Sequence, residues 1–144
     1  MTTFILDASV AMKWAMPFAG EPLTHISVNL FTRFSLGDID FIVPGIFWAE
    51  VGNVLWKGTK QGRWDRRQAE VVEKDLRDLE FQTVPSRLLL NEALKIAFDY
   101  DRHPADCFYV ALAVESHADL ITADERLVNA LAARFPVRWL GAFQ

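Results

Sequence analysis

Short apolar segments alternate with stretches of helical periodicity along most of this chain, and the alternation limits the folds it can adopt. No turn signal typical of a β-hairpin joins one apolar segment to the next. Parallel strands need long crossover connections, usually helices, and their sheets are covered on both faces. We therefore expect an α/β protein, a three-layer α/β/α sandwich with a short, mostly parallel central sheet.

The expected elements follow from local pattern. Strands are predicted at short apolar segments, namely residues 3–6, 41–43, 81–84, 120–122 and 137–140. Helices are predicted where apolar residues recur at helical spacing, namely residues 8–14, 22–35, 46–58, 66–79, 86–99, 105–117 and 125–134. No linker, low-complexity segment or repeat interrupts this order, so we expect a single domain over residues 1–144.

Composition is that of an ordinary globular protein, with 51% hydrophobic and 24% charged residues. Cys107 is the single cysteine, which excludes a disulfide within the chain and favours a reducing cytoplasm. We expect no membrane association, because no apolar run approaches the roughly 20 residues that cross a bilayer. The net charge of −4 argues against a protein that coats nucleic acid without specificity, but it does not exclude a nucleic-acid enzyme.

Two acidic residues follow predicted buried strands. Asp7 comes after Phe4-Ile5-Leu6, and Asp124 comes soon after Leu120-Ile121-Thr122. Ligands of open parallel sheets bind outside the carboxyl ends of the strands, where both carboxylates are expected to lie. The alternative is structural, because each acid also stands where it could cap the following helix.

Two further acids lie on predicted helices. Glu50 falls on the edge of the apolar face of its helix, where an unpaired charge would be costly to bury. Asp106 shares a helical face with Val110 and Ala113, although its place near a helix start also gives it a capping role. Both positions are therefore candidates for a functional carboxylate.

Several carboxylates that meet in one cleft would repel one another unless a cation were bound. Mg²⁺ and Mn²⁺ are hard cations that prefer oxygen ligands, so either would suit such a site. The histidines are scattered and no cysteine spacing supports a zinc site. The acids therefore favour a magnesium or manganese site.

Two other classes of protein with acids at strand ends fit poorly. A phosphoacceptor receiver domain needs an aspartate at the end of its middle strand, and the segment FQTVPS has none. An aspartyl phosphohydrolase would have a second acid two residues after Asp7, where this chain has Ser9.

Four segments in this order carry a resemblance to a known family: ILDASV, PGIFWAEVGNVLWK, ADCFYVALAVESHADLITAD and ERLVNAL. The chain resembles the PIN-domain family over almost its whole length, and most closely the VapC-type toxins of bacterial toxin–antitoxin pairs. The resemblance implies a PIN-like fold and a Mg²⁺- or Mn²⁺-dependent endoribonuclease that hydrolyses RNA phosphodiester bonds. It also implies a cognate antitoxin as partner and a homodimer. The alternative is a PIN-like module that binds a partner without catalysis.

The resemblance assigns the catalytic and metal-binding acids to positions in this sequence, namely Asp7, Glu50, Asp106 and Asp124. Asp7 and Asp106 are expected as direct ligands, and the other two acids complete the site directly or through water. Ser9 and Thr122 match the small hydroxyl residues that often flank such a site, with helix capping as their alternative role.

Residues 57–67, KGTKQGRWDRR, are strongly basic and form the last feature of interest. The residues considered for RNA contact are Lys60, Arg63, Trp64, Arg66 and Arg67. The cations could hold phosphates while Trp64 stacks on a base. Two alternatives stay open, a solvated connection between helices and a contact with the antitoxin. Trp56 lies opposite the apolar face of its helix and is expected at an interface.

Overall fold

A computed structural model describes residues 1–143, apart from the side chain of Phe18; residue 144 of the expected domain lies outside this range. All five of its strands form one sheet of order β3-β2-β1-β4-β5. They are β1 (Thr2–Leu6), β2 (Ile39–Pro44), β3 (Gln82–Val84), β4 (Asp119–Thr122) and β5 (Val137–Trp139). Every neighbouring pair is parallel, which confirms the predicted α/β sandwich with a parallel sheet.

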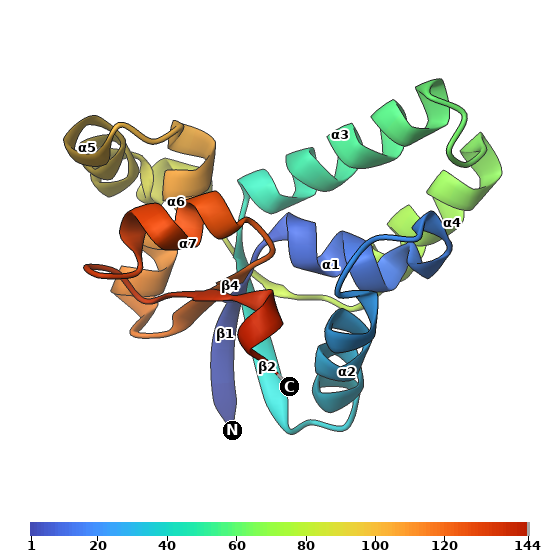
Figure 1. The fold of residues 1–144 in the computed structure, drawn as a ribbon, viewed down its shortest axis with the longest axis horizontal. Helices are drawn as coiled ribbons and strands as arrows, with labels where there is room; N and C mark the ends of the chain where they lie inside the picture. Colours follow the sequence, from blue (N-terminus) through green and yellow to red (C-terminus); the bar gives the residue numbers. More distant parts are fainter. Residues whose placement is uncertain (144) are drawn as a thin grey trace.

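Helices connect the strands and cover the sheet. The α-helices are α1 (Ala8–Ala15), α2 (Thr24–Ser35), α3 (Ile46–Lys60), α4 (Arg66–Asp78), α5 (Leu90–Tyr100), α6 (Pro104–Ser116) and α7 (Glu125–Leu131). Single turns of 3₁₀-helix are η1 (Pro17–Ala19), η2 (Ser86–Leu88) and η3 (Leu140–Ala142). In Figure 1, α1 to α4 lie to the right of β1 and β2, while α5 to α7 lie to the left. Within residues 1–143, no helix is both long and apolar enough to cross a membrane.

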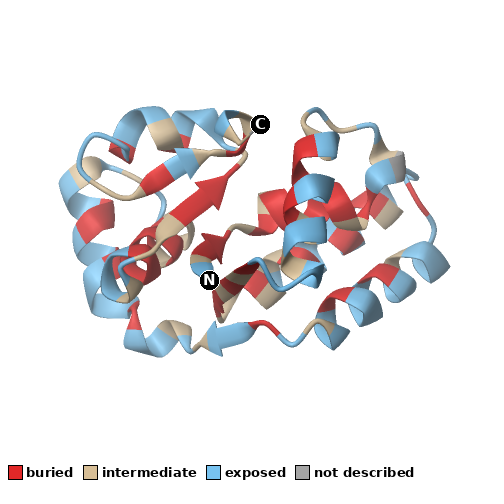
Figure 2. Cartoon of the chain, turned by 90° about the horizontal axis from the view of Figure 1, so that it is seen from below, coloured by how far each residue is buried: buried red, intermediate tan, exposed pale blue. Residues whose placement is uncertain are grey.

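The core lies on both faces of the central strands, which explains their continuous apolar sequences. Phe4, Ile5 and Leu6 of β1 are all buried, as are Leu120 and Ile121 of β4. Figure 2 shows this burial concentrated in the middle of the sheet and on the helix faces turned toward it. Helix α6 packs against the sheet on one side and α5 on the other, so it is apolar around most of its circumference.

The predicted boundaries differ from the observed ones in a few places. Strand β2 begins at Ile39, two residues before the predicted start, and the predicted helix over 86–99 is divided into η2 and α5. Helix α7 ends at Leu131, not at residue 134, because the chain turns there to enter β5. In that turn the backbone N–H groups of Arg134 and Phe135 both donate to the carbonyl of Leu131.

Helix α3 continues past Gly58, where the sequence predicted its end, and the reason is a contact with Trp64. A Cβ atom at residue 58 would overlap the indole ring of Trp64, which packs directly on the glycine backbone. The indole Nε1–H donates to the carbonyl of Leu55 at 3.1 Å, and only 6% of Trp64 is exposed. The glycine therefore holds the start of α4 against α3 instead of ending the helix.

This packing predicts opposite effects for two substitutions in the same helix. Gly58→Ala should lower the free energy of unfolding by about 1–3 kcal/mol, because the added methyl group displaces the Trp64 ring. Gly52→Ala should raise it by roughly 0.5–1 kcal/mol, since a Cβ there meets no atom within 4 Å and alanine is the better helix former. Urea unfolding of both variants would measure the difference. A stabilising effect of both would contradict the packing role of Gly58.

Candidate functional site

Asp7 lies directly after β1, at the carboxyl edge of the sheet. It precedes α1, but its side chain makes no capping hydrogen bond to that helix. Its Oδ2 instead accepts hydrogen bonds from the Ser9 hydroxyl at 3.0 Å and the Thr122 hydroxyl at 2.6 Å. Thr122 is the last residue of β4, which pairs with β1 in parallel register, so the sheet itself brings the two residues together.

The two hydroxyls connect Asp7 to the turn between β4 and α7. The Ser9 oxygen accepts a hydrogen bond from the backbone N–H of Ala123 at 3.2 Å, and the Thr122 oxygen accepts one from Asp124 N–H at 3.1 Å. Each hydroxyl thus has its proton directed at Asp7, because its lone pairs face a backbone donor. Ser9 and Thr122 fix the orientation of the carboxylate.

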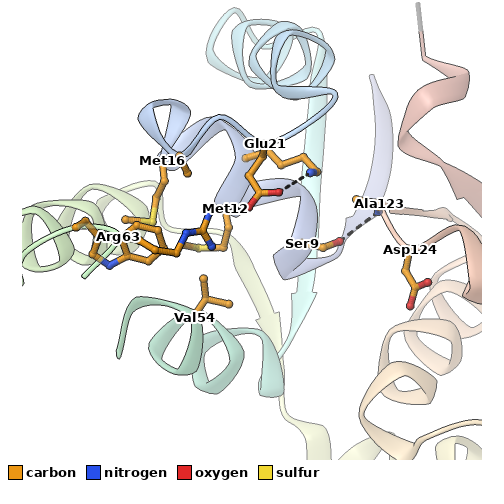
Figure 3. A pocket seen from close by; sticks show the side chains of 11 residues that line it. Ser9, Met12, Met16, Glu21, Val54, Arg63, Ala123 and Asp124 are labelled. Carbon is orange, nitrogen blue, oxygen red and sulfur yellow. Dashed lines mark hydrogen bonds and ion pairs between the residues drawn. The ribbon is translucent and has the colours of Figure 1, made fainter. Parts of the chain in front are cut away.

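Asp124 combines a capping role with a place beside the site. Its Oδ1 accepts hydrogen bonds from the backbone N–H groups of Arg126 at 3.0 Å and Leu127 at 3.3 Å, which caps α7. The same residue lines the cleft shown in Figure 3, and its negative charge raises the pKa of Asp106. The capping alternative is correct for this acid, but its charge still acts on Asp106.

Glu50 reaches the site from α3 and is held by a residue of α6. The Tyr109 hydroxyl donates to Glu50 Oε1 at 2.5 Å. Burial raises the pKa of Glu50, and the charges of Asp7 and Asp106 raise it further, although the Tyr109 hydrogen bond acts in the opposite direction. Sequence reasoning missed Tyr109. Its position three residues after Asp106, on the same side of the helix, was the signal available.

Asp106 stands in the first turn of α6 without being needed to cap it. The His103 side chain provides the cap, since its Nδ1 accepts a hydrogen bond from the backbone N–H of Ala105 at 3.1 Å. Burial is the main reason that the pKa of Asp106 is raised, followed by the charge of Asp124. The carboxylate is therefore held close to another acid at a cost that capping does not explain.

Asp106 is within electrostatic range of each of the other three acids, and Asp7 is also within range of Glu50. Burial raises the pKa of Asp7, and the charge of Asp106 raises it further, against the hydrogen bonds from Thr122 and Ser9. Oxygen donors that repel one another suit a hard divalent cation, so the chemistry of this set fits Mg²⁺ or Mn²⁺. Within residues 1–143, however, no three acidic, histidine or cysteine side chains are already placed to hold a metal ion together.

The structure corrects the expected role of Trp64. Its ring is buried between Gly58 and the guanidinium of Arg63, whose carbon lies 5.2 Å from the ring centroid. The indole is thus packed in the protein interior and is not exposed for stacking on a base. Trp56 is the displayed aromatic of this region, with 62% of its surface exposed.

The cations of residues 57–67 have different surroundings. Arg63 forms an ion pair with Glu21 at 3.0 Å, and Arg66 forms one with Glu70 at 2.7 Å. Lys60 lies 5.7 Å from the centroid of Trp56, while Arg67 is exposed on α4. Among them Arg63 lines the same cleft as Asp124. The basic stretch is therefore not one uniform surface.

Solved structures share this fold. PAE2754 from Pyrobaculum aerophilum aligns with a TM-score of 0.69 and 20% identity, over 98% of this chain and 85% of that one. A toxin–antitoxin complex from Klebsiella pneumoniae aligns at 0.60 and 15% identity, over 94% of this chain and 95% of that one. VapBC2 from Rickettsia felis, bound to a promoter DNA fragment, aligns at 0.63 and 10% identity, over 96% and 98%. At such low identities, these TM-scores show similarity of fold alone.

Sequence comparison identifies the family. No curated protein matches the chain significantly. The sequence profile of the PIN domain matches residues 4–132, a range that contains Asp7, Glu50, Asp106 and Asp124. The parallel sheet and the acids gathered at its carboxyl edge agree with that match. The chain belongs to the PIN domain family.

Proposed function

We propose that this protein is a divalent-metal-dependent endoribonuclease, the toxin of a toxin–antitoxin pair. The observation that carries the proposal is the position of Asp7 at the carboxyl edge of the sheet, where Ser9 and Thr122 hold its carboxylate and where the charges of Asp7 and Asp106 raise the pKa of Glu50. Carboxylates that raise one another's pKa values are destabilising without a cation, and such an arrangement is typical of functional sites.

The proposed ligands follow from the positions of the acids. Asp7 and Asp106 would hold Mg²⁺ or Mn²⁺ directly, while Glu50 and Asp124 would complete the site directly or through water. When bound, the ion would polarise the scissile phosphate and lower the pKa of a water molecule. Ser9 and Thr122 orient Asp7 through their hydrogen bonds to Oδ2.

Glu50 is suited to accept the proton of the attacking water. Tyr109 donates to Oε1 and fixes the side chain, which leaves Oε2 as the accepting atom. Burial and the neighbouring acids raise the pKa of Glu50 and so make it a stronger base than an exposed glutamate. The raised pKa of the buried Tyr109 keeps the phenol protonated, as the donor role requires.

The toxin assignment draws on the structural neighbours, because two of those described above are complexes of a toxin with its antitoxin or VapBC assemblies. We propose an antitoxin as the protein partner, a homodimer as the assembly and the cytoplasm as the location. The exposed Trp56 on α3 is a candidate for the antitoxin contact. Lys60, Arg66 and Arg67 remain candidates for either RNA or antitoxin binding.

A second candidate function is a PIN-like module that binds a partner without catalysis. It is favoured by one observation, namely that the described acids do not form a preassembled group of three metal ligands. Incubation of purified protein with RNA, with Mn²⁺ or with EDTA, separates the two functions. Cleavage that requires the metal supports the nuclease, and its absence supports the binding module.

Removal of one proposed ligand should abolish cleavage. Asp106→Asn should reduce the rate of Mn²⁺-dependent RNA cleavage by about 100-fold or more, since several kcal/mol of transition-state stabilisation would be lost. Asp38→Asn is the matched control, because Asp38 is an exposed carboxyl in the turn before β2. Full activity of Asp106→Asn would contradict the metal-binding role of this acid.

The raised pKa values also predict how stability depends on pH in a chelator. Acids whose pKa values are raised on folding favour the folded state while they are protonated. Their contribution is complete below their ordinary pKa values of 3.8 and 4.5 and is lost as the pH rises through the raised values. The free energy of unfolding should therefore fall less steeply with pH in Asp106→Asn than in the parent, and Mn²⁺ should stabilise the parent more.

Urea unfolding at a series of pH values, with and without EDTA, measures this difference. Asp38→Asn should follow the parent at every pH. A variant Asp106→Asn that loses several kcal/mol in the chelator would instead show that Asp106 stabilises the fold.

A further inference from the structure

A cleft of about 310 Å³ leads away from the acidic site toward the connection between α3 and α4. Its lining includes Ser9, Ala123 and Asp124 from the side of the acidic site, and three further charged residues, namely Lys13, Glu21 and Arg63. Figure 3 shows Ser9, Ala123 and Asp124 on one side of the cleft and Arg63 on the other, with the apolar side chains Met12, Met16 and Val54 around Arg63. The volume is at the lower end of the roughly 300–1,000 Å³ found for small-ligand pockets.

Lys13 places a largely buried ammonium group in this cleft. It lies on α1, the helix that begins after Asp7, and only 11% of its side chain is exposed. Its Nζ is 3.6 Å from Glu21 Oε2. A buried ammonium is costly unless it is paired, so this lysine needs an anion in the cleft.

Arg63 is held in place on the opposite wall. One of its terminal nitrogens, Nη2, donates to Glu21 Oε1 at 3.0 Å, and its guanidinium covers the ring of Trp64. Trp64 is itself fixed by its hydrogen bond to Leu55 and its contact with Gly58. The guanidinium is therefore positioned before any ligand arrives, although 42% of the side chain remains exposed.

Glu21 joins the two cations in the way that a phosphate would. The hydrogen bond from Arg63 lowers the pKa of Glu21, so the side chain is a carboxylate at neutral pH, with one oxygen toward each cation. One carboxylate facing two cations leaves a surplus positive charge. A phosphodiester also presents two unesterified oxygens that can accept from two donors.

The backbone that carries Glu21 lies outside the helices. It forms the connection between η1 and α2, with Gly20 and Leu23 at positive φ on either side. Movement of the Glu21 side chain would therefore not require any helix to unwind. The carboxylate can be replaced in the cleft without loss of the surrounding fold.

We propose that Lys13 and Arg63 form a subsite for a phosphate of the RNA strand next to the scissile one, and that Glu21 occupies this subsite when RNA is absent. This inference rests on the proposed nuclease function, since it requires that the strand cross the acidic site. Arg63 and Lys13 are then binding residues, and Glu21 competes with the substrate.

The test is binding of a short, labelled single-stranded RNA of mixed sequence in EDTA, measured by anisotropy at several salt concentrations. Arg63→Gln should weaken binding roughly tenfold, because a charge-assisted hydrogen bond is lost. It should also lower the slope of log K against log salt by about 0.7, the value for one phosphate contact on a single strand. Glu21→Gln should strengthen binding about threefold, because the competing carboxylate is removed.

The opposite signs distinguish this role from a structural one. If the ion pair only held the connection before α2 in place, both substitutions would change RNA binding in the same direction, and that result would overturn the inference. Arg77→Gln and Glu73→Gln are matched controls, because these residues form a similar pair at 2.7 Å on the exposed face of α4. Both should leave RNA binding unchanged.

Competition identifies the occupant of the cleft. Inorganic phosphate should displace the RNA from the parent and less so from Arg63→Gln. Displacement by a glutamate-rich peptide but not by phosphate would assign the cleft to an acidic protein segment and overturn the inference. A parent that fails to bind RNA in EDTA would also overturn it, whereas the nuclease proposal would still be decided by cleavage with metal.

Discussion

The hydrogen bond between Thr122 and Asp7, at 2.6 Å, joins the two central strands at the edge where all the acids gather. It depends on the parallel register of β1 and β4, which places the ends of both strands side by side. The bond stabilises the charged form of Asp7, while burial and the charge of Asp106 oppose it. The pKa of Asp7 is therefore set by opposing effects, and Asp106 and Glu50 lie within electrostatic range of this carboxylate.

The second contact of this kind connects the two sides of the molecule. Glu50 comes from α3 and Tyr109 from α6, which lie on opposite sides of the central strands in Figure 1. Their hydrogen bond links α3 to α6 at the acidic site, a connection that the pairing of the strands does not make. Because burial raises the pKa values of both Glu50 and Asp106, this region lowers the stability of the fold when no cation is present. Such a cost is expected where function opposes stability.

The sequence predicted what depends on local pattern. Asp7 and Asp124 could be placed at one edge, because apolar strands joined by helices imply a parallel sheet whose carboxyl ends coincide. The roles of Trp64 and Gly58 could not be predicted, since they depend on how α4 returns against α3. The basic stretch of residues 57–67 suggested that Trp64 would be exposed for stacking on a base. Its ring instead packs inward, and the neighbouring Arg63 lies over it. Side-chain direction in a connection is decided by tertiary contacts that no periodicity encodes.

The same limit explains why Lys13 and Glu21 were not recognised as functional candidates. Lys13 lies in the last turn of a largely apolar helix, where a solvated cation would be the ordinary expectation. In the folded chain it faces a carboxylate eight positions later and an arginine from another helix connection. The cleft consequently joins Asp124, beside the acidic site, to two cations that share a single carboxylate. The proposed binding of a phosphodiester strand and a divalent cation fits this distribution of charge, and under that proposal an acidic protein with a net charge of −4 would hold a polyanion locally.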